Sequence, residues 1–140
     1  MLYVDTCVLV AALTSEANTT RMQDWLSSQL AEELTVSHLT ITEFSSALAL
    51  KLRTQQLKIS ERNDALAMFN RLVADSFNVI VVTSSNFRTA ARLADQHLLG
   101  LRTGDALHLA LAVEHRATVC TLDRRLAEAG ETLGAKTQLL

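Results

Sequence analysis

The sequence predicts an α/β fold, a three-layer sandwich in which a central, mostly parallel sheet of four to five strands lies between helices on both faces. Short apolar runs rich in strand-forming residues alternate with longer segments of helical periodicity, which is typical of strand–helix–strand units with right-handed crossovers. The chain has no proline and only four glycines, so its helices can run uninterrupted. Its 140 residues, 49% of them hydrophobic, suit one domain, 1–140, with a sizeable core.

The N-terminal part of the chain predicts two strands and three helices. Residues 2–4 are apolar and rich in strand formers, which is typical of a strand buried on both faces. A short helix is expected over residues 7–13, and apolar residues at four-residue spacing predict another over residues 19–34. Residues 34–37 form the next expected strand. A Thr-x-x-Glu capping box then opens a helix that runs to about Thr54.

The C-terminal part continues this alternation. One β-branched run, residues 78–82, lacks polar alternation, so we expect it in the centre of a parallel sheet. The helix expected over residues 84–98 ends before Gly100, a residue that favours helix C-termini. The last residues are interpreted as an edge strand. The expected helices cover residues 60–73, 84–98, 103–115 and 123–129, and the expected strands cover residues 78–82, 117–122 and 136–140.

The charge balance is not that of a generally basic nucleic-acid binder. With 13 basic and 15 acidic residues, the formal net charge is −2. A nuclease of this composition has to attract its substrate locally, or as a dimer with a shared basic groove. The longest apolar runs are far shorter than the roughly 20 residues that span a membrane, and no signal peptide is visible. We therefore expect a soluble, cytoplasmic protein without a membrane partner.

Several other kinds of site lack support in the sequence. Cys7 and Cys120 both lie in apolar runs and are interpreted as small core residues. The histidines have no Cys/His partners at zinc-binding spacing, and neither a Gly-x-Ser-x-Gly elbow nor a glycine-rich phosphate loop occurs. His108 lies within a strongly apolar helical pattern, which is more typical of a hydrogen-bonded core histidine than of a metal ligand.

Acidic residues stand where apolar runs give way to helical patterns: Asp5, Glu43, Asp105 and Asp123. Three of them follow expected strands, and the carboxyl ends of parallel strands meet at one edge of a sheet. Asp105 lies in the first turn of an expected helix and reaches that edge if the helix starts there. Facing carboxylates repel, and a hard divalent cation such as Mg²⁺ or Mn²⁺ compensates for that repulsion. The pattern therefore predicts a metal-dependent site that cleaves phosphodiester bonds.

Each of these acids also has a structural interpretation. Asp5 and Asp123 can serve as helix N-caps, and Glu43 can close the capping box that begins at Thr40. Asp105 can be a first-turn acid favoured by the helix dipole. Caps and a metal pocket are compatible, however, because helix N-termini also attract the phosphate of a substrate.

Four segments of the chain resemble the PIN domain and, more narrowly, the toxin ribonucleases of bacterial VapBC toxin–antitoxin pairs: residues 3–9, 42–44, 102–110 and 121–126. They occur in family order and at family-like spacing over nearly the whole chain. The resemblance implies a PIN-like fold and endonucleolytic cleavage of RNA. It also implies a Mg²⁺ or Mn²⁺ site built from Asp5, Glu43, Asp105 and Asp123. The chain departs from the family pattern at Cys7, where many relatives have Ser or Asn.

A division of roles follows as a hypothesis. Asp5 and Asp105 are expected to be the main ligands of a first ion, and Asp123 a direct or water-mediated ligand. Glu43 is expected to orient or deprotonate the attacking water, or to join a second ion. A bound metal lowers the pKa of water enough to provide a nucleophile near neutral pH. Whether one or two ions act stays open.

Polar and basic neighbours of the acids are secondary candidates. Thr6 and Thr121 can hold ligands or waters through their hydroxyl groups, and Thr121 matches a hydroxyl residue that the family often keeps. Arg102, Arg124 and Arg125 flank two of the acids and can meet RNA phosphates. The alternative for the threonines is ordinary strand or helix-start use, and for the arginines a solvated surface.

Partners are also expected. An apolar stripe is formed by Phe44, Leu48 and Leu52, together with residues 66–73. It either packs in the core, forms a homodimer face or binds an antitoxin helix or strand. The resemblance implies a homodimer and a small antitoxin that blocks the acidic pocket. One alternative is a nuclease of the same fold that acts in RNA processing or on DNA. Another is a non-catalytic binding module stabilised by metal.

Overall fold

The computed structural model describes residues 1–140 and confirms the predicted sandwich. The strands form a five-stranded sheet in the order β3-β2-β1-β4-β5, and every neighbouring pair is parallel. β1 lies in the middle, between β2 and β4. The strands are β1 (Leu2–Val4), β2 (Leu34–Ser37), β3 (Asn78–Ile80), β4 (Thr118–Thr121) and β5 (Lys136–Leu139).

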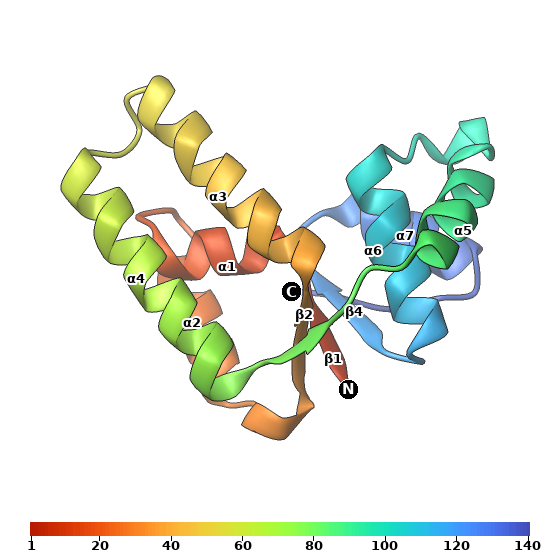
Figure 1. Cartoon of the computed structure of the whole chain (residues 1–140), viewed down its shortest axis with the longest axis horizontal. Coiled ribbons are helices and arrows are strands. Elements are labelled where there is room, and N and C mark those ends of the chain that lie inside the picture. Colours follow the sequence, from red (N-terminus) through yellow and green to blue (C-terminus); the bar gives the residue numbers. More distant parts are fainter.

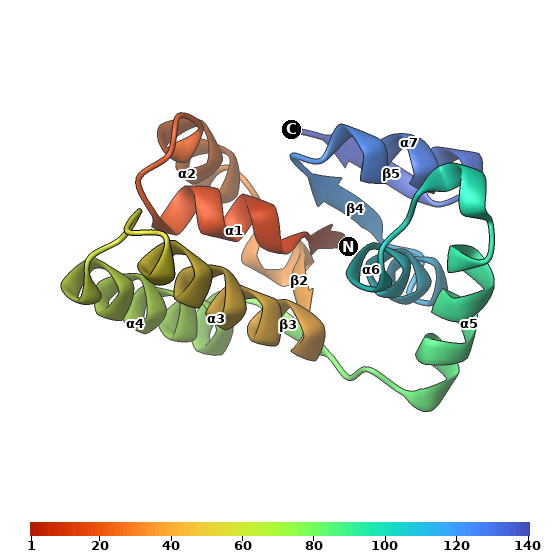
Figure 2. The same cartoon turned by 90° about the horizontal axis from the view of Figure 1, so that it is seen from above.

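Helices flank the sheet on both sides. In Figures 1 and 2, α1 to α4 gather on one side and α5 to α7 on the other. No helix combines the length and the hydrophobicity that crossing a membrane requires. The helices are α1 (Thr6–Leu13), α2 (Thr19–Ser27), α3 (His38–Arg53), α4 (Ile59–Ser76), α5 (Ser84–Ala94), α6 (Thr103–Glu114) and α7 (Arg124–Thr132), with short 3₁₀ turns at η1 (Ala31–Glu33) and η2 (His97–Leu99).

The core is divided between the two faces of the sheet, because neighbouring side chains of a strand point to opposite faces. On β1, Val4 packs with α1, α3 and α4, whereas Tyr3 packs with α6 and α7. The rings of Phe44 on α3 and Phe69 on α4 stack with their centroids 4.1 Å apart. Phe44 and Leu48 are fully buried, so this part of the apolar stripe serves the core.

Several details of the sequence prediction are wrong. The helix expected over residues 84–98 ends at Ala94, and η2 follows as a separate turn. The segment expected over residues 19–34 ends its α-helix at Ser27, and η1 leads into β2. The β-branched strand is not central: β3 lies at an edge of the sheet, and Val79 and Val81 are 38% and 61% exposed. An apolar run shows that a strand is hydrophobic, but the strand order depends on the path of the crossovers, which places β1 in the centre.

The start of α3 also differs from the expectation. Its N-cap is Ser37, whose hydroxyl accepts a hydrogen bond from the Thr40 amide. The capping box therefore joins Ser37 and Thr40, and Glu43 lies one turn further along the helix. This shift leaves the Glu43 carboxylate free of the cap.

Candidate metal centre

Asp5 occupies the end of the central strand. It follows β1 directly, and its amide donates a 3.0 Å hydrogen bond to the Cys120 carbonyl of β4. Asp5 stands at the N-cap position of α1, but its side chain makes no capping hydrogen bond. The residue is only 7% exposed. The structure thus excludes the helix-cap interpretation and directs this buried carboxylate to other side chains.

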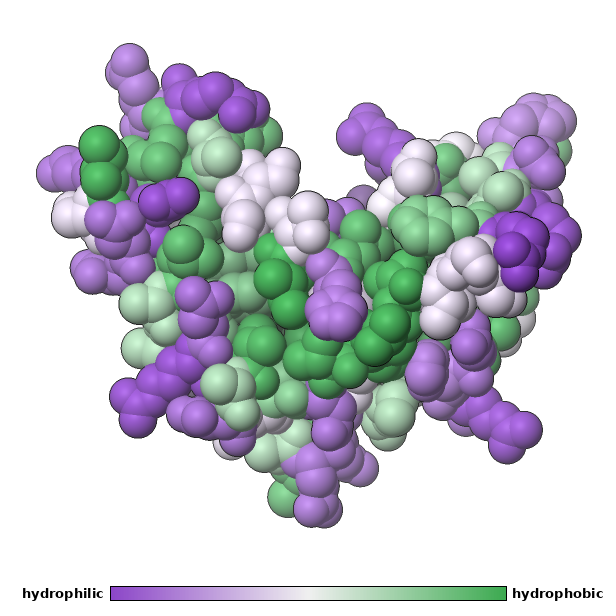
Figure 3. Space-filling model, in the orientation of Figure 1, coloured by the Kyte–Doolittle hydropathy of each residue, from purple (hydrophilic) through white to green (hydrophobic).

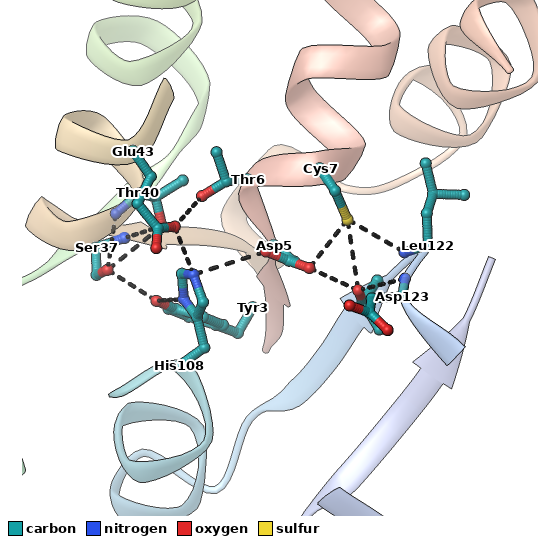
Figure 4. A network of polar contacts seen from close by, with 11 residues as sticks. Tyr3, Asp5, Thr6, Cys7, Ser37, Thr40, Glu43, His108, Leu122 and Asp123 are labelled. Carbon is teal, nitrogen blue, oxygen red and sulfur yellow. Dashed lines mark hydrogen bonds and ion pairs between the residues drawn. The ribbon is translucent and has the colours of Figure 1, made fainter. Parts of the chain in front are cut away.

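One oxygen of the Asp5 carboxylate is held by two donors (Figure 4). Its Oδ2 accepts hydrogen bonds from Thr121 Oγ1 at 2.6 Å and from Cys7 Sγ at 2.9 Å. Cys7 Sγ also accepts a hydrogen bond from the Leu122 amide at 3.3 Å. Burial, followed by the charge of Asp5, raises the pKa of the Cys7 thiol to about 12, so Cys7 acts as a neutral donor. Oδ1 faces His108 Nε2.

The second oxygen of Asp5 faces a hydrogen-bonded pair, the buried His108 and the partly exposed Glu43. His108 Nε2 lies 3.6 Å from Asp5 Oδ1 and 2.7 Å from Glu43 Oε2. Thr6 Oγ1 donates a 2.6 Å hydrogen bond to the same Glu43 oxygen. His108 Nδ1 lies 2.7 Å from the Tyr3 hydroxyl. Figure 4 shows Asp5 between this group and the Cys7–Asp123 side of the site.

Glu43 reaches this position because α6 has a glycine opposite it. A Cβ atom added at Gly104 would lie 2.5 Å from Glu43 Oε1, closer than real Cβ contacts come. The first turn of α6 therefore packs directly against the carboxylate. This contact also answers the question left by the sequence about Asp105, because it places the start of α6 at the same edge as Asp5.

The electrostatics of the pair favour an ionised contact. Burial opposes charge on Glu43, but the hydrogen bond and the charge of His108 outweigh it, and the pKa of Glu43 lies below its ordinary value. Burial likewise opposes charge on His108. The hydrogen bond with Glu43 and the nearby carboxylates, with Asp5 before Asp105, raise the pKa of His108 above its ordinary value. In this arrangement His108 neutralises carboxylates that would otherwise repel each other.

The other two predicted acids lie at helix starts beside this group. Asp105 Oδ2 accepts a 2.9 Å hydrogen bond from the Arg102 amide at the start of α6. Asp123 Oδ1 accepts from the amides of Arg125 at 2.8 Å and Leu126 at 3.3 Å, and so caps α7. The Asp123 amide donates to Thr121 Oγ1, the same hydroxyl that holds Asp5. One oxygen of each carboxylate is thus engaged in a cap.

The ligand atoms that lie together are those of Asp5, Glu43 and His108, all within 4.8 Å of one another. Two carboxylates and an imidazole, drawn from three segments, fit a divalent cation by their donor chemistry; Asp5 and His108 are buried and Glu43 is partly exposed. Asp105 and Asp123 border this group but are not part of it. The basic candidates Arg102, Arg124 and Arg125 are exposed at the starts of α6 and α7.

Sequence reasoning missed the partners of His108. The side chain is buried with both ring nitrogens hydrogen-bonded, as expected, but only one partner, Tyr3, belongs to the core, and the other is the site residue Glu43. One signal was present in the sequence. His108 follows Asp105 by three positions on one helix, and this spacing places both side chains on the same face.

Comparison with known proteins supports this architecture. A sequence model of the PIN domain family matches residues 2–131. No curated protein sequence gives a significant match. Solved structures with the same fold include FitAcB from Neisseria gonorrhoeae, with 22% identity, 98% of this chain and 96% of that chain covered, and a TM-score of 0.72.

Two further structures extend the comparison. VapC20 of Mycobacterium tuberculosis, described as a sarcin–ricin loop cleaving toxin, has 16% identity, 93% and 95% coverage of this chain and that chain, and a TM-score of 0.75. VapBC2 of Rickettsia felis, bound to a DNA fragment from its promoter, has 14% identity, 100% and 99% coverage, and a TM-score of 0.72. At these identities the likeness shows the shared fold.

Proposed function

The chain belongs to the PIN domain family, and from this premise we propose that it is a divalent-metal-dependent endoribonuclease, the toxin of a type II toxin–antitoxin pair. The observation that carries the proposal is the meeting of Asp5 and Glu43 with His108 at one edge of the sheet. Asp5 follows β1, and Glu43 and His108 lie on α3 and α6; the Asp5 carboxylate is buried and the Glu43 carboxylate is partly exposed. Buried charges are costly and are retained where a function uses them.

The proposed site assigns a role to each acid. Asp5 and Asp105 are the main ligands of the ion, with Asp105 reaching it from the border of the Asp5–Glu43–His108 group, and Asp123 is a direct or water-mediated ligand. Glu43 orients or deprotonates the attacking water, or joins an ion itself, which its place beside Asp5 and His108 supports. Thr121 and Cys7 fix Oδ2 of Asp5, so that Oδ1 is presented to the ion. When bound, the ion supplies Lewis-acid stabilisation of phosphate charge and lowers the pKa of water.

Substrate binding is assigned to the arginines around the site. Arg102, Arg124 and Arg125 are exposed at the N-termini of two helices that also carry Asp105 and Asp123. Helix N-termini and guanidinium groups both attract phosphate. With a net charge of −2, such local attraction has to replace a generally basic surface. RNA is the proposed substrate. Residues 1–140 form the single nuclease domain that cleaves it, and we place this activity in the cytoplasm.

Partners are proposed by analogy with the neighbours. Similar folds occur in structures described as VapBC-1 from Haemophilus influenzae and as a toxin–antitoxin complex from Klebsiella pneumoniae. We therefore assign this chain a cognate antitoxin that covers the metal centre.

A homodimer is proposed from the surface. Val79 and Val81 are exposed on the edge strand β3 and the segment after it. Figure 3 shows a hydrophobic area over the middle of this face. Light scattering of wild type and of Val81→Lys tests whether a second copy of the chain covers this surface. Val81→Lys should weaken the dimer, and a dimer that persists unchanged places the interface elsewhere.

The decisive test of the activity is Asp5→Asn. Purified variant and wild type are incubated with single-stranded RNA, structured RNA and DNA, each with Mg²⁺, with Mn²⁺ and with a chelator. Wild type should cut RNA only with metal, and Asp5→Asn should not cut. Asp95→Asn is the matched control. Asp95 is an exposed acid that is not among the site residues, so this variant should retain full activity.

The same assay separates the alternatives. Cleavage of DNA, or of structured precursors only, indicates a nuclease of the same fold with another task. Mn²⁺-dependent stability without turnover indicates a non-catalytic module. Full cleavage by pure, folded Asp5→Asn contradicts the assignment of the site.

A further inference from the structure

We propose that His108 Nε2 is itself a ligand of the metal ion, beside Asp5 and Glu43, and gives the centre a mixed oxygen and nitrogen character. This inference rests on the proposed metal-dependent function and deepens it. An arrangement of acids alone provides only oxygen ligands. The buried imidazole, aimed between two carboxylates, changes which ion the site prefers.

The distances fit one ion. An octahedral cation about 2.1 Å from its ligands holds neighbouring ligand atoms about 3 Å apart. Nε2 lies 3.6 Å from Asp5 Oδ1 and 2.7 Å from Glu43 Oε2, on either side of that value. The three ligand atoms lie within 4.8 Å of one another, so all three can approach a single ion.

The rest of the imidazole is already fixed. Nδ1 lies 2.7 Å from the Tyr3 hydroxyl, which lies 2.7 Å from Ser37 Oγ. Nδ1–H can donate to the Tyr3 oxygen while the Tyr3 hydroxyl donates to Ser37. This chain leaves the lone pair of Nε2 available for a cation. Metal-binding histidines are typically held this way, with the second nitrogen hydrogen-bonded to a fixed partner.

The ion-free contact and the metal bond use the same atom. Nε2 now shares a hydrogen bond with Glu43 Oε2. An ion at Nε2 would take the place of the proton in that hydrogen bond, the proton would leave to solvent, and both carboxylates would keep a positive partner. His108 therefore holds the two carboxylates near their ligand positions before the ion arrives. Its side chain is only 3% exposed, so water does not compete for Nε2 from the open surface.

A nitrogen ligand predicts an ion preference. Imidazole binds transition-metal ions better than it binds Mg²⁺, which favours oxygen. The wild-type chain should thus bind Mn²⁺ more tightly than Mg²⁺. Removal of the imidazole should weaken Mn²⁺ binding by about tenfold or more and Mg²⁺ binding less.

The test is pulsed EPR of Mn²⁺ bound to the full chain, which detects nitrogen directly coordinated to manganese. The other histidines, His38, His97 and His115, are all exposed, so a triple variant with Gln at these positions keeps His108 as its sole histidine. Wild type and triple variant should both show a histidine nitrogen coupling. Labelling histidine with ¹⁵N should convert that coupling from the ¹⁴N to the ¹⁵N pattern. His108→Gln should lose it, and calorimetry should show the weaker Mn²⁺ binding.

The outcomes separate this inference from the proposed function. Mn²⁺ binding without histidine coupling in wild type overturns His108 as a ligand and leaves a carboxylate centre in place. Loss of the coupling in the triple variant overturns it equally, because another histidine then binds the ion. Absence of Mn²⁺ and Mg²⁺ binding overturns the metal centre and this inference with it. If His108→Gln does not fold, as shown by circular dichroism, the labelled triple variant decides alone.

Discussion

Thr121 Oγ1 donates a 2.6 Å hydrogen bond to Oδ2 of Asp5, across 116 positions of the sequence. Thr121 ends β4 and Asp5 follows β1, and these neighbouring strands bring the two side chains together. The same hydroxyl accepts from the Asp123 amide, so it joins two of the predicted acids. Thr121 is therefore a positioning residue for the carboxylate at the centre of the site.

Thr121→Val should reduce metal affinity and RNA cleavage by about ten- to a hundredfold, because second-layer partners of metal ligands have effects of this size. Thr121→Ser retains the hydroxyl and should stay near wild type. Mn²⁺ titration by calorimetry beside the cleavage assay checks both variants. Equal loss in the two would point to packing of the methyl group instead of the hydrogen bond.

Cys7→Ala should destabilise the fold by about 1–3 kcal/mol, because it removes the acceptor of the Leu122 amide and one of the two donors to Asp5 Oδ2. Cys7→Ser can donate and accept in the same place and should lie within about 1 kcal/mol of wild type. Urea denaturation measures both. A stable alanine variant would mean that water replaces the thiol at low cost.

Gly104→Ala should separate stability from activity. Alanine favours the helix by about 1 kcal/mol over glycine, so α6 should not weaken. The added Cβ would lie 2.5 Å from Glu43 Oε1, so the carboxylate must move and cleavage should fall. Thr103→Ala, at the neighbouring exposed position, is the control and should keep its activity. Thermal melting and cleavage rates give the comparison, and unchanged cleavage by Gly104→Ala would show that Glu43 tolerates the shift.

The metal-free protein should be most stable at mildly acidic pH. His108 holds its proton more tightly when folded, so its contribution is complete below its ordinary pKa of 6.5 and is lost as pH rises through the raised value. Glu43 has a lowered pKa, so its contribution is complete above its ordinary 4.5 and is lost as pH falls through the lowered value.

Melting curves with a chelator across pH 4–9 check this window, which spans the ordinary values of 4.5 and 6.5. His108→Gln removes the partner of Glu43, so its profile should be flatter between neutral and alkaline pH. A wild-type profile that keeps rising through that range would contradict the ionised His108–Glu43 contact.

The sequence alone predicted the sandwich, most of its elements and a common edge of the sheet for Asp5, Glu43 and Asp123, and it left the place of Asp105 open. It could do so because helical and strand periodicities are local properties, and because parallel strands end at a common edge. It did not predict that Glu43 lies outside its capping box, since the helix starts at His38 and that start depends on where β2 ends.

Only the tertiary structure decided which side chains share the pocket. Periodicity identified the apolar helix around His108 but not the surface that its imidazole meets, because that depends on how α6 packs against α3 and β1. The same is true of β3, whose hydrophobicity is local but whose place at the edge depends on the whole chain path. Contacts such as that of Gly104 with Glu43 join segments that are distant in the sequence. They form only when two helices pack closely, so the local sequence pattern does not reveal them.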